Sequence, residues 1–273
     1  GFAPLKKQLI YRYLDFGIGV NFDELIITNG AQEALAIALQ CVAKPGDVIA
    51  IESPTYFGII ELIESLGLKA LEIPICSEQG IWLDDLAKAL EQHKIVAGVF
   101  STSVNNPVGS FMPESNRAAL VALLESHEVV LIEDDVYGDL HFTEQRAKPA
   151  QYYSQKGLVI TCSSFSKTAA PSYRVGWMIA GRFAKQALRL KRALSCSAPL
   201  LNQWTLSEFL ASGDYDRNLV RLRQTLRSNK ERMIHQIQRH FPIETCISDP
   251  QGGCVIWVEL PVGYDATRLF HEA

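Results

Sequence analysis

The feature that most restricts how this chain can fold is a series of short runs rich in Ile and Val, the first five of which are separated by stretches with helical spacing. Seven such runs lie at residues 25–28, 48–52, 70–75, 96–101, 129–134, 158–163 and 175–180. Most of them lack the period-2 alternation of strands with one solvated face, which indicates that helices cover both faces of the sheet. We therefore predict an α/β fold whose large domain holds a mostly parallel seven-stranded sheet flanked by helices.

The pattern changes after the last of these runs. Before it, helix-spaced apolar residues fill the intervals at 31–42, 56–66, 83–91 and 113–127. Beyond residue 180, helical patterns lead into a long, charged amphipathic stretch at residues 215–240. We place a domain boundary here: residues 1–212 form the large domain, with a short N-terminal segment, and residues 213–273 begin a small α+β domain.

The chain beyond residue 240 predicts a small and unfinished domain. It contains a short strand at 243–247, a Gly252-Gly253 turn and a second strand at 254–260. Helical spacing follows from Asp265 to Ala273 and ends after about two turns, with the apolar face scarcely begun. Because no initiator Met precedes Gly1 either, we expect this sequence to be an internal piece with a truncated second domain.

Composition argues against several classes of protein. The 26 basic and 30 acidic side chains give a net charge of −4, so there is no basic excess to neutralise a nucleic-acid backbone. No apolar run approaches the ~18 residues of a membrane span. The six cysteines and six histidines show neither CxxC nor metal-ligand spacing. This usage favours reduced thiols in a cytoplasmic protein and predicts no bound metal.

A lysine follows the predicted strand 158–163. It is Lys167, preceded by the hydroxyl side chains of Ser163, Ser164 and Ser166 and followed after seven residues by Arg174. A lone lysine at a strand end is usually a solvated side chain. Hydroxyls before it and an arginine one short loop later would instead surround a small dianion, and the lysine amine could form a Schiff base with a carbonyl.

Acidic residues end the predicted strand 129–134. Tyr137 follows Asp134 by three positions. Such a pattern alone is more often a solvated strand terminus. The functional interpretation is that Asp134 faces the nitrogen of a heterocycle and keeps it protonated, which makes the ring an electron sink, while Tyr137 donates to a ring oxygen.

Three further turns follow predicted strands. Asn29-Gly30 leads into a helix that begins with Ala31 and Gln32, where free backbone N–H groups suit a phosphate. The loop with Tyr56 could present an aromatic face, and the loop with Asn106 an amide, to a bound ring. Each turn is ordinary by itself. Five polar elements at the carboxyl ends of five strands are much less expected by chance, because such ends meet at one edge of a sheet.

This set of motifs, in this order, resembles the fold-type I pyridoxal-phosphate (PLP) enzymes, and among them the class I/II aminotransferases. The resemblance implies that Lys167 carries PLP as a Schiff base and that Asp134 pairs with the pyridinium nitrogen. It assigns Tyr137 and Asn106 to the phenolic oxygen of the ring, and Tyr56 to stacking on the ring. It also implies a phosphate site made of Ala31, Gln32, Ser164 and Arg174.

Finer similarities point to one branch of this family. The stretches 135–142, 164–177 and 252–261 resemble the aminotransferase-like domain of MocR-type regulators in the GntR family, and the seven-residue spacing from Lys167 to Arg174 agrees with that branch. In those proteins an N-terminal winged-helix domain binds DNA and the PLP domain senses a ligand. The resemblance therefore implies a homodimer that takes an amino acid or other amino compound. It also implies DNA contact only through a winged-helix domain that this sequence lacks.

Two family features fall outside the sequence: the arginine that clamps a substrate carboxylate, and the tyrosine of the partner subunit that reaches the phosphate. Three functions consequently stay open. The chain could belong to a ligand-sensing regulator, which the motifs favour, to a free-standing aminotransferase that moves an amino group from an amino acid to a 2-oxo acid, or to another PLP enzyme such as a decarboxylase.

Overall fold

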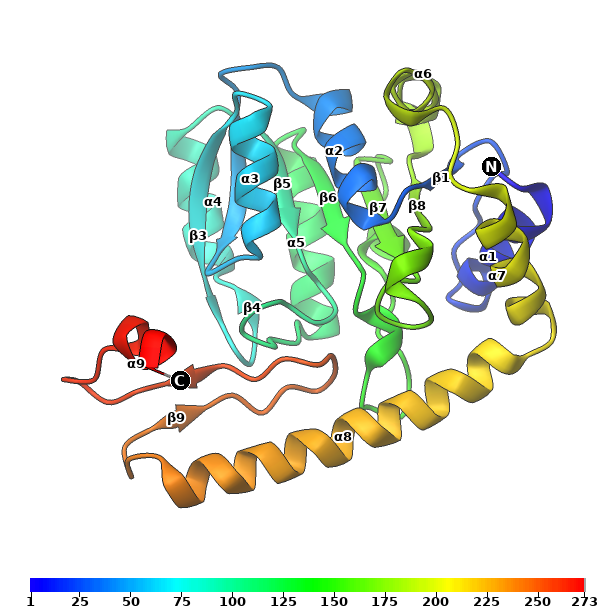
Figure 1. Ribbon diagram of the computed structural model, residues 1–273. Helices are drawn as coiled ribbons and strands as arrows, with labels where there is room; N and C mark the ends of the chain where they lie inside the picture. The colour runs from blue at the N-terminus through cyan, green and yellow to red at the C-terminus, as the bar shows by residue number, and fades with distance from the viewer. Residues whose placement is uncertain (273) are drawn as a thin grey trace.

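A single eight-stranded sheet organises the molecule, which was analysed as a computed structural model that describes residues 1–272 (Figure 1). The strands run in the order β1-β8-β7-β6-β5-β2-β3-β4. Their bounds are β1 (Leu25–Thr28), β2 (Val48–Ser53), β3 (Lys69–Cys76), β4 (Gly80–Ile81), β5 (Ile95–Phe100), β6 (Val130–Asp134), β7 (Val159–Ser164) and β8 (Gly176–Ile179). All seven predicted strands are present. The additional strand, β4, has two residues, which is too short for a period to show in the sequence.

The strand directions bring distant loops together. Strands β3, β2, β5, β6 and β7 are parallel neighbours, whereas β8 is antiparallel to both β7 and β1. The carboxyl ends of β1, β2, β5, β6 and β7 consequently meet at one edge of the sheet, together with the amino end of β8. This is the edge at which α/β sheets bind ligands.

Helices cover both faces of the sheet, as its apolar strands require (Figure 1). The α-helices are α1 (Ala3–Asp15), α2 (Ala31–Val42), α3 (Phe57–Ser65), α4 (Leu83–Gln92), α5 (Glu114–Ser126), α6 (Ala184–Ser195), α7 (Leu200–Ala211), α8 (Asp214–His240) and α9 (Ala266–Glu272). One apolar cluster joins the sheet to α2, α3 and α6, and a second joins it to α4 and α5. Short 3₁₀ helices lie at η1 (Gly138–Leu140), η2 (Ala150–Tyr153), η3 (Pro171–Tyr173) and η4 (Gly181–Phe183).

Helix α1 replaces the unassigned N-terminal segment of the prediction. Its residues Leu5, Leu9 and Tyr13 are buried at a spacing of four, in a third apolar cluster shared with α7 and α8. Tyr13 also accepts a hydrogen bond at its hydroxyl from Nε1 of Trp177 on β8, over 3.0 Å. The N-terminal helix is thus part of the core.

The chain after α8 is more loosely built. Strands β9 (Cys246–Ile247) and β10 (Val258–Glu259) pair antiparallel but are much shorter than predicted. The predicted Gly252-Gly253 turn does not close a tight hairpin between them. Gly252 instead bridges His141, and a Cβ at Gly252 would lie 2.8 Å from the carbonyl oxygen of Leu140. These glycines permit a close approach of two backbones.

Within residues 1–272, no helix combines the length and the apolar character needed to cross a bilayer, since the 27-residue α8 is highly charged. All six cysteines are free. No cluster of three or more metal-binding side chains occurs in the same described range.

Candidate cofactor site

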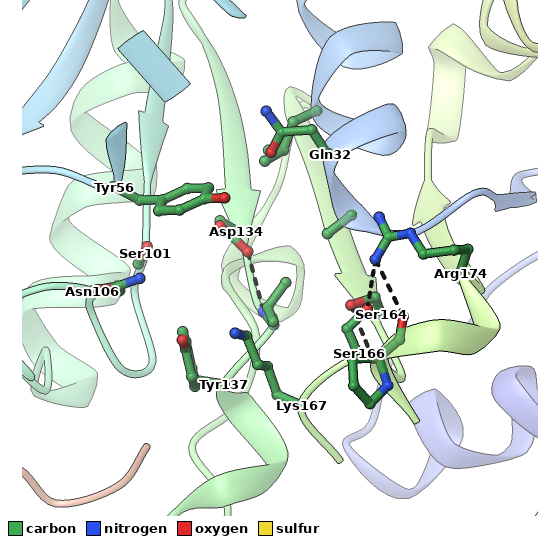
Figure 2. A pocket seen from close by; sticks show the side chains of 14 residues that line it. Gln32, Tyr56, Ser101, Asn106, Asp134, Tyr137, Ser164, Ser166, Lys167 and Arg174 are labelled. Carbon is green, nitrogen blue, oxygen red and sulfur yellow. Dashed lines mark hydrogen bonds between the residues drawn. The ribbon is translucent and has the colours of Figure 1, made fainter. Parts of the chain in front are cut away.

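One pocket lies at the edge where the carboxyl ends of the strands meet (Figure 2). It has a volume of about 210 Å³. All nine residues that the sequence analysis assigned to a cofactor line this single pocket. The lining residues are Ala31, Gln32, Leu35, Tyr56, Ser101, Asn106, Asp134, Val136, Tyr137, Ser164, Ser166, Lys167, Pro171 and Arg174. They come from the ends of β2, β5, β6 and β7 with the loops that follow them, and from the first two turns of α2.

One end of the pocket suits an anion. Helix α2 begins at Ala31, so its unpaired backbone N–H groups and its positive dipole end face this region. The guanidinium of Arg174 lies beside it in Figure 2, and its Nη1 donates to Oγ of Ser166 over 3.3 Å. Nη2 of Arg174 donates to the carbonyl oxygen of Asn29, also over 3.3 Å. Cationic and neutral donors thus converge without a carboxylate among the lining residues at this end.

Gly30 makes this convergence possible. Its φ of 85° and ψ of 176° lie in a region that is essentially restricted to glycine. A Cβ there would lie 2.5 Å from Nη2 of Arg174. The glycine therefore lets the guanidinium approach the start of α2. Arg174 itself has a left-handed backbone, with φ 51° and ψ 47°, at the turn that precedes β8.

The opposite end of the pocket is acidic. Asp134 ends β6, and its Oδ1 accepts a hydrogen bond from the backbone N–H of Val136 over 3.2 Å. Burial, reinforced by the nearby charge of Asp135, raises the pKa of Asp134 to about 6 even though Lys167 lowers it. A cation brought next to this buried carboxyl group would stabilise its ionised form and lower its pKa.

Lys167 lies below Asp134 in Figure 2, and its amine points toward Tyr137. Its Nζ lies 5.7 Å from the centroid of the Tyr137 ring. Among the described residues Lys167 forms no ion pair, which leaves the amine free to react with a bound carbonyl compound. Burial raises the pKa of the Tyr137 hydroxyl, and the neighbouring Cys254 adds to this effect, so Tyr137 is a neutral hydrogen-bond donor.

Tyr56 and Asn106 lie on the side of the pocket opposite Arg174 (Figure 2). The Tyr56 ring packs tightly over the start of α3, because a Cβ at Gly58 would lie 2.5 Å from Cε1 of Tyr56. Gln32 reaches the same helix, since its Nε2 donates to the carbonyl oxygen of Gly58 over 2.9 Å. The side-chain amide of Gln32 is thus already engaged, which leaves its backbone N–H as the group that can face an anion.

A buried carboxyl group that the sequence pattern did not reveal lies behind the acidic end. Glu52 on β2 accepts hydrogen bonds from the backbone N–H of Ser101 over 2.8 Å and from Nδ2 of Asn105 over 2.6 Å. Burial raises its pKa to about 8, and Asp134 contributes to this shift. Glu52 therefore fixes the loop that carries Asn106. The sequence signal was a single acid inside an apolar strand.

A second buried network extends from the same strand end toward α1 and α8. Asp135 pairs with Arg146, and Nε of Arg146 donates to Asp139 over 2.7 Å. Asp139 also accepts from Arg12 on α1 and from the hydroxyl of Tyr215 on α8. Although burial opposes it, the charges of Arg146 and Arg12 hold the pKa of Asp139 below its usual value. The loop after Asp134 is thereby tied to both helices.

Comparison with known proteins gives a consistent picture. The family model for aminotransferase class I and II matches residues 5–271. Two curated relatives from Escherichia coli K12 bear names as uncharacterized HTH-type transcriptional regulators. YdcR is 39% identical over 98% of this chain and 58% of its own length, and YjiR is 38% identical over 97% of this chain and 56% of its own length. The chain thus spans less than three fifths of these relatives.

Among solved structures, α-aminoadipate aminotransferase LysN from Thermus thermophilus, complexed with N-(5'-phosphopyridoxyl)-L-leucine, superposes with a TM-score of 0.92. It is 30% identical, and the match covers 99% of this chain and 69% of that chain. The predicted fold class, a fold-type I large domain with a mostly parallel sheet, is confirmed by this likeness.

Proposed function

The chain belongs to the aminotransferase class I and II family, and we propose that it is the PLP-binding, ligand-sensing part of a transcriptional regulator of the MocR type. The observation that carries this proposal is the convergence of Lys167, Asp134 and Arg174 on one pocket, in a chain that is 38–39% identical to two HTH-type relatives and matches 56–58% of their length. Its cofactor is PLP.

The two ends of the pocket fit the two ends of PLP. The start of α2, Ser164 and Arg174 would hold the phosphate, since they supply backbone, hydroxyl and guanidinium donors. Asp134 would accept from the protonated ring nitrogen, and the pyridinium would in turn favour the ionised carboxylate. The bound cofactor supplies an aldehyde for Schiff-base exchange and an electron sink.

The remaining residues orient the ring and the reacting amine. Tyr56 would stack on the ring, while Tyr137 and Asn106 would donate to its phenolic oxygen. Lys167 would bond to the cofactor and, after an amino compound displaces it, would be placed to move a proton at its Nζ. Together these nine residues perform binding, orientation and proton transfer.

We also propose the arrangement of the full protein. Residues 1–212 would form the PLP domain, and a small domain would begin at residue 213, next to the start of α8. The regulator would be a cytoplasmic homodimer, for which the free cysteines and the family are the support. An amino acid or other amino compound would be its ligand, and DNA would bind to a winged-helix domain outside this chain.

A free-standing aminotransferase is the second candidate. It is favoured by the retained pair of Lys167 and Asp134 and by the likeness to LysN. A sensor needs PLP and ligand binding, whereas an aminotransferase also needs repeated proton transfer. The pocket supplies groups for both tasks.

The test uses the protein at its full natural length. Promoter DNA is titrated with the protein in the presence and absence of PLP and of amino acids, and amino transfer to 2-oxoglutarate is measured in parallel. We expect PLP or an amino compound to change the affinity for DNA, and linkage requires DNA to change the affinity for that ligand by the same factor. Multiple turnovers without DNA binding in any condition would reject the sensor and support the aminotransferase.

A further inference from the structure

A buried ion pair lies behind the anion-binding end of the pocket. Lys191 on α6 pairs with Glu33 on α2, with 2.8 Å between Nζ and Oε2, and their side chains are only 3% and 14% exposed. Ser195 completes the cluster, because its hydroxyl accepts from Lys191 and donates to the other carboxylate oxygen of Glu33. None of the three residues lines the pocket.

The pair reaches the pocket through Asn29. Glu33 accepts from the backbone N–H of Asn29 over 2.6 Å and from its side-chain amide over 3.3 Å. The carbonyl oxygen of Asn29 then accepts from Nη2 of Arg174 over 3.3 Å. A continuous chain of contacts therefore runs from Lys191 through Glu33 and Asn29 to the guanidinium that faces the pocket.

The charge of Glu33 gives these contacts an electrostatic effect on the pocket in addition to their structural one. Glu33 stands in the first turn of α2, which also carries the backbone donors that would face a phosphate. Although burial opposes it, hydrogen bonds from Lys191, Ser195 and Asn29 hold the pKa of Glu33 below its usual value, so this carboxylate is ionised at neutral pH. An uncompensated carboxylate there would repel a dianion through a medium of low dielectric constant.

We propose that Lys191 is a positioning residue for the phosphate end of the pocket. It cancels the charge of Glu33 and keeps Glu33 in the geometry that fixes Asn29 and Arg174. This inference rests on the proposed function, because it concerns the phosphate group of PLP. It assigns to Lys191 a selective effect on phosphorylated ligands that a simple link between α6 and α2 would not produce.

The test compares the affinities for PLP and for pyridoxal, which lacks the phosphate. In the full-length protein, we expect Lys191→Met to lower the affinity for PLP about tenfold or more, because the variant leaves a buried carboxylate unpaired. The affinity for pyridoxal should stay within about twofold of the wild-type value, since the acidic end of the pocket, where the ring nitrogen would lie, is unchanged. Lys185→Met, an exposed lysine on the same helix, serves as the matched control and should change neither affinity.

Glu33→Gln separates charge from structure, since it removes the same ion pair but leaves a carbonyl oxygen for Asn29. We expect its ratio of PLP to pyridoxal affinity to equal or exceed that of the wild type. The double variant Glu33→Gln/Lys191→Met, which also bypasses any folding defect of Lys191→Met, should recover the wild-type ratio within about threefold.

An equal fall of the ratio in both single variants, or no recovery in the double variant, would overturn the inference while leaving the proposed function intact. If the wild-type protein binds pyridoxal and PLP with the same affinity, the phosphate end is unused and the inference also fails. If the wild-type protein binds neither compound, the proposed function fails and the inference falls with it.

Discussion

The two ends of the pocket treat a buried carboxyl group in opposite ways. At the anion-binding end, Glu33 has Lys191 as a buried partner, and its pKa is lowered. At the ring end, Asp134 has no such partner within hydrogen-bonding distance among the described residues, and burial raises its pKa to about 6. The carboxylate behind the first end is paired within the chain itself. The carboxyl group at the second end gains a paired cation only when a ligand brings one.

This difference suggests that the two ends of the pocket have different roles. A prebuilt cradle of backbone donors and Arg174 would supply affinity at a site remote from the reacting bonds. At the acidic end of the pocket, burial makes the charge of Asp134 unfavourable in the cofactor-free protein, and a protonated heterocycle would remove this cost. Substitutions at the two ends should therefore have different consequences, the first for binding and the second for both stability and chemistry.

The largest effect is expected from Arg174→Met, because it removes the guanidinium nearest to the start of α2. Charge-assisted hydrogen bonds are worth about 1.5–3 kcal/mol each, so the affinity for PLP should fall roughly 10- to 150-fold. The affinity for pyridoxal should hardly change. Equilibrium titrations with both compounds measure this, with Arg189→Met on α6 as an exposed control. An equal loss of affinity for PLP and for pyridoxal would contradict the proposed difference between the two ends.

A smaller effect is expected from Asp134→Asn, which should raise the stability of the cofactor-free protein. The folded protein keeps the Asp134 proton up to about pH 6, whereas the unfolded chain loses it near the ordinary value of 3.8. The wild type therefore loses stability as the pH rises between these values, and the asparagine variant does not. Its free energy of unfolding should exceed that of the wild type by about 1–3 kcal/mol at pH 7.

Denaturant unfolding at pH 4 and pH 7 checks this expectation, since the difference should nearly vanish at pH 4. Asp23→Asn, an exposed aspartate, is the control. The same Asp134 variant should retain PLP but exchange amino groups more slowly, because the ring nitrogen loses its ionic partner. A variant that is less stable at pH 7, or that reacts at the wild-type rate, would contradict the assigned role.

The sequence predicted the sheet and the lining of the pocket because both depend on short-range signals. Apolar runs rich in Ile and Val marked β1 and β2, Asp134 is the last residue of β6, and Lys167 follows the end of β7 by three residues. The supporting layer could not be predicted in the same way. Glu33 and Lys191 are 158 residues apart in the sequence, and either one alone resembles a solvated charge on a helix.

Helix α1 and the chain after α8 show a second limit of prediction from the sequence. The spacing of Leu5, Leu9 and Tyr13 is helical, but only the folded core shows that it packs against β1 and β8. Beyond α8, the chain exposes Ile243 and Val262 almost completely, so its apolar pattern has little packing to define where strands begin and end. Short strands there depend on tertiary contacts more than on propensity.

We propose that this pocket binds PLP through Lys167, and covalent mapping of the bound cofactor is the experiment that decides it. The full-length protein is incubated with PLP, reduced with borohydride, digested and analysed by mass spectrometry. We predict one phosphopyridoxyl adduct, on the peptide that contains Lys167, and its absence from Lys167→Ala. An adduct found chiefly on another lysine, or one that persists in Lys167→Ala, would contradict the claim.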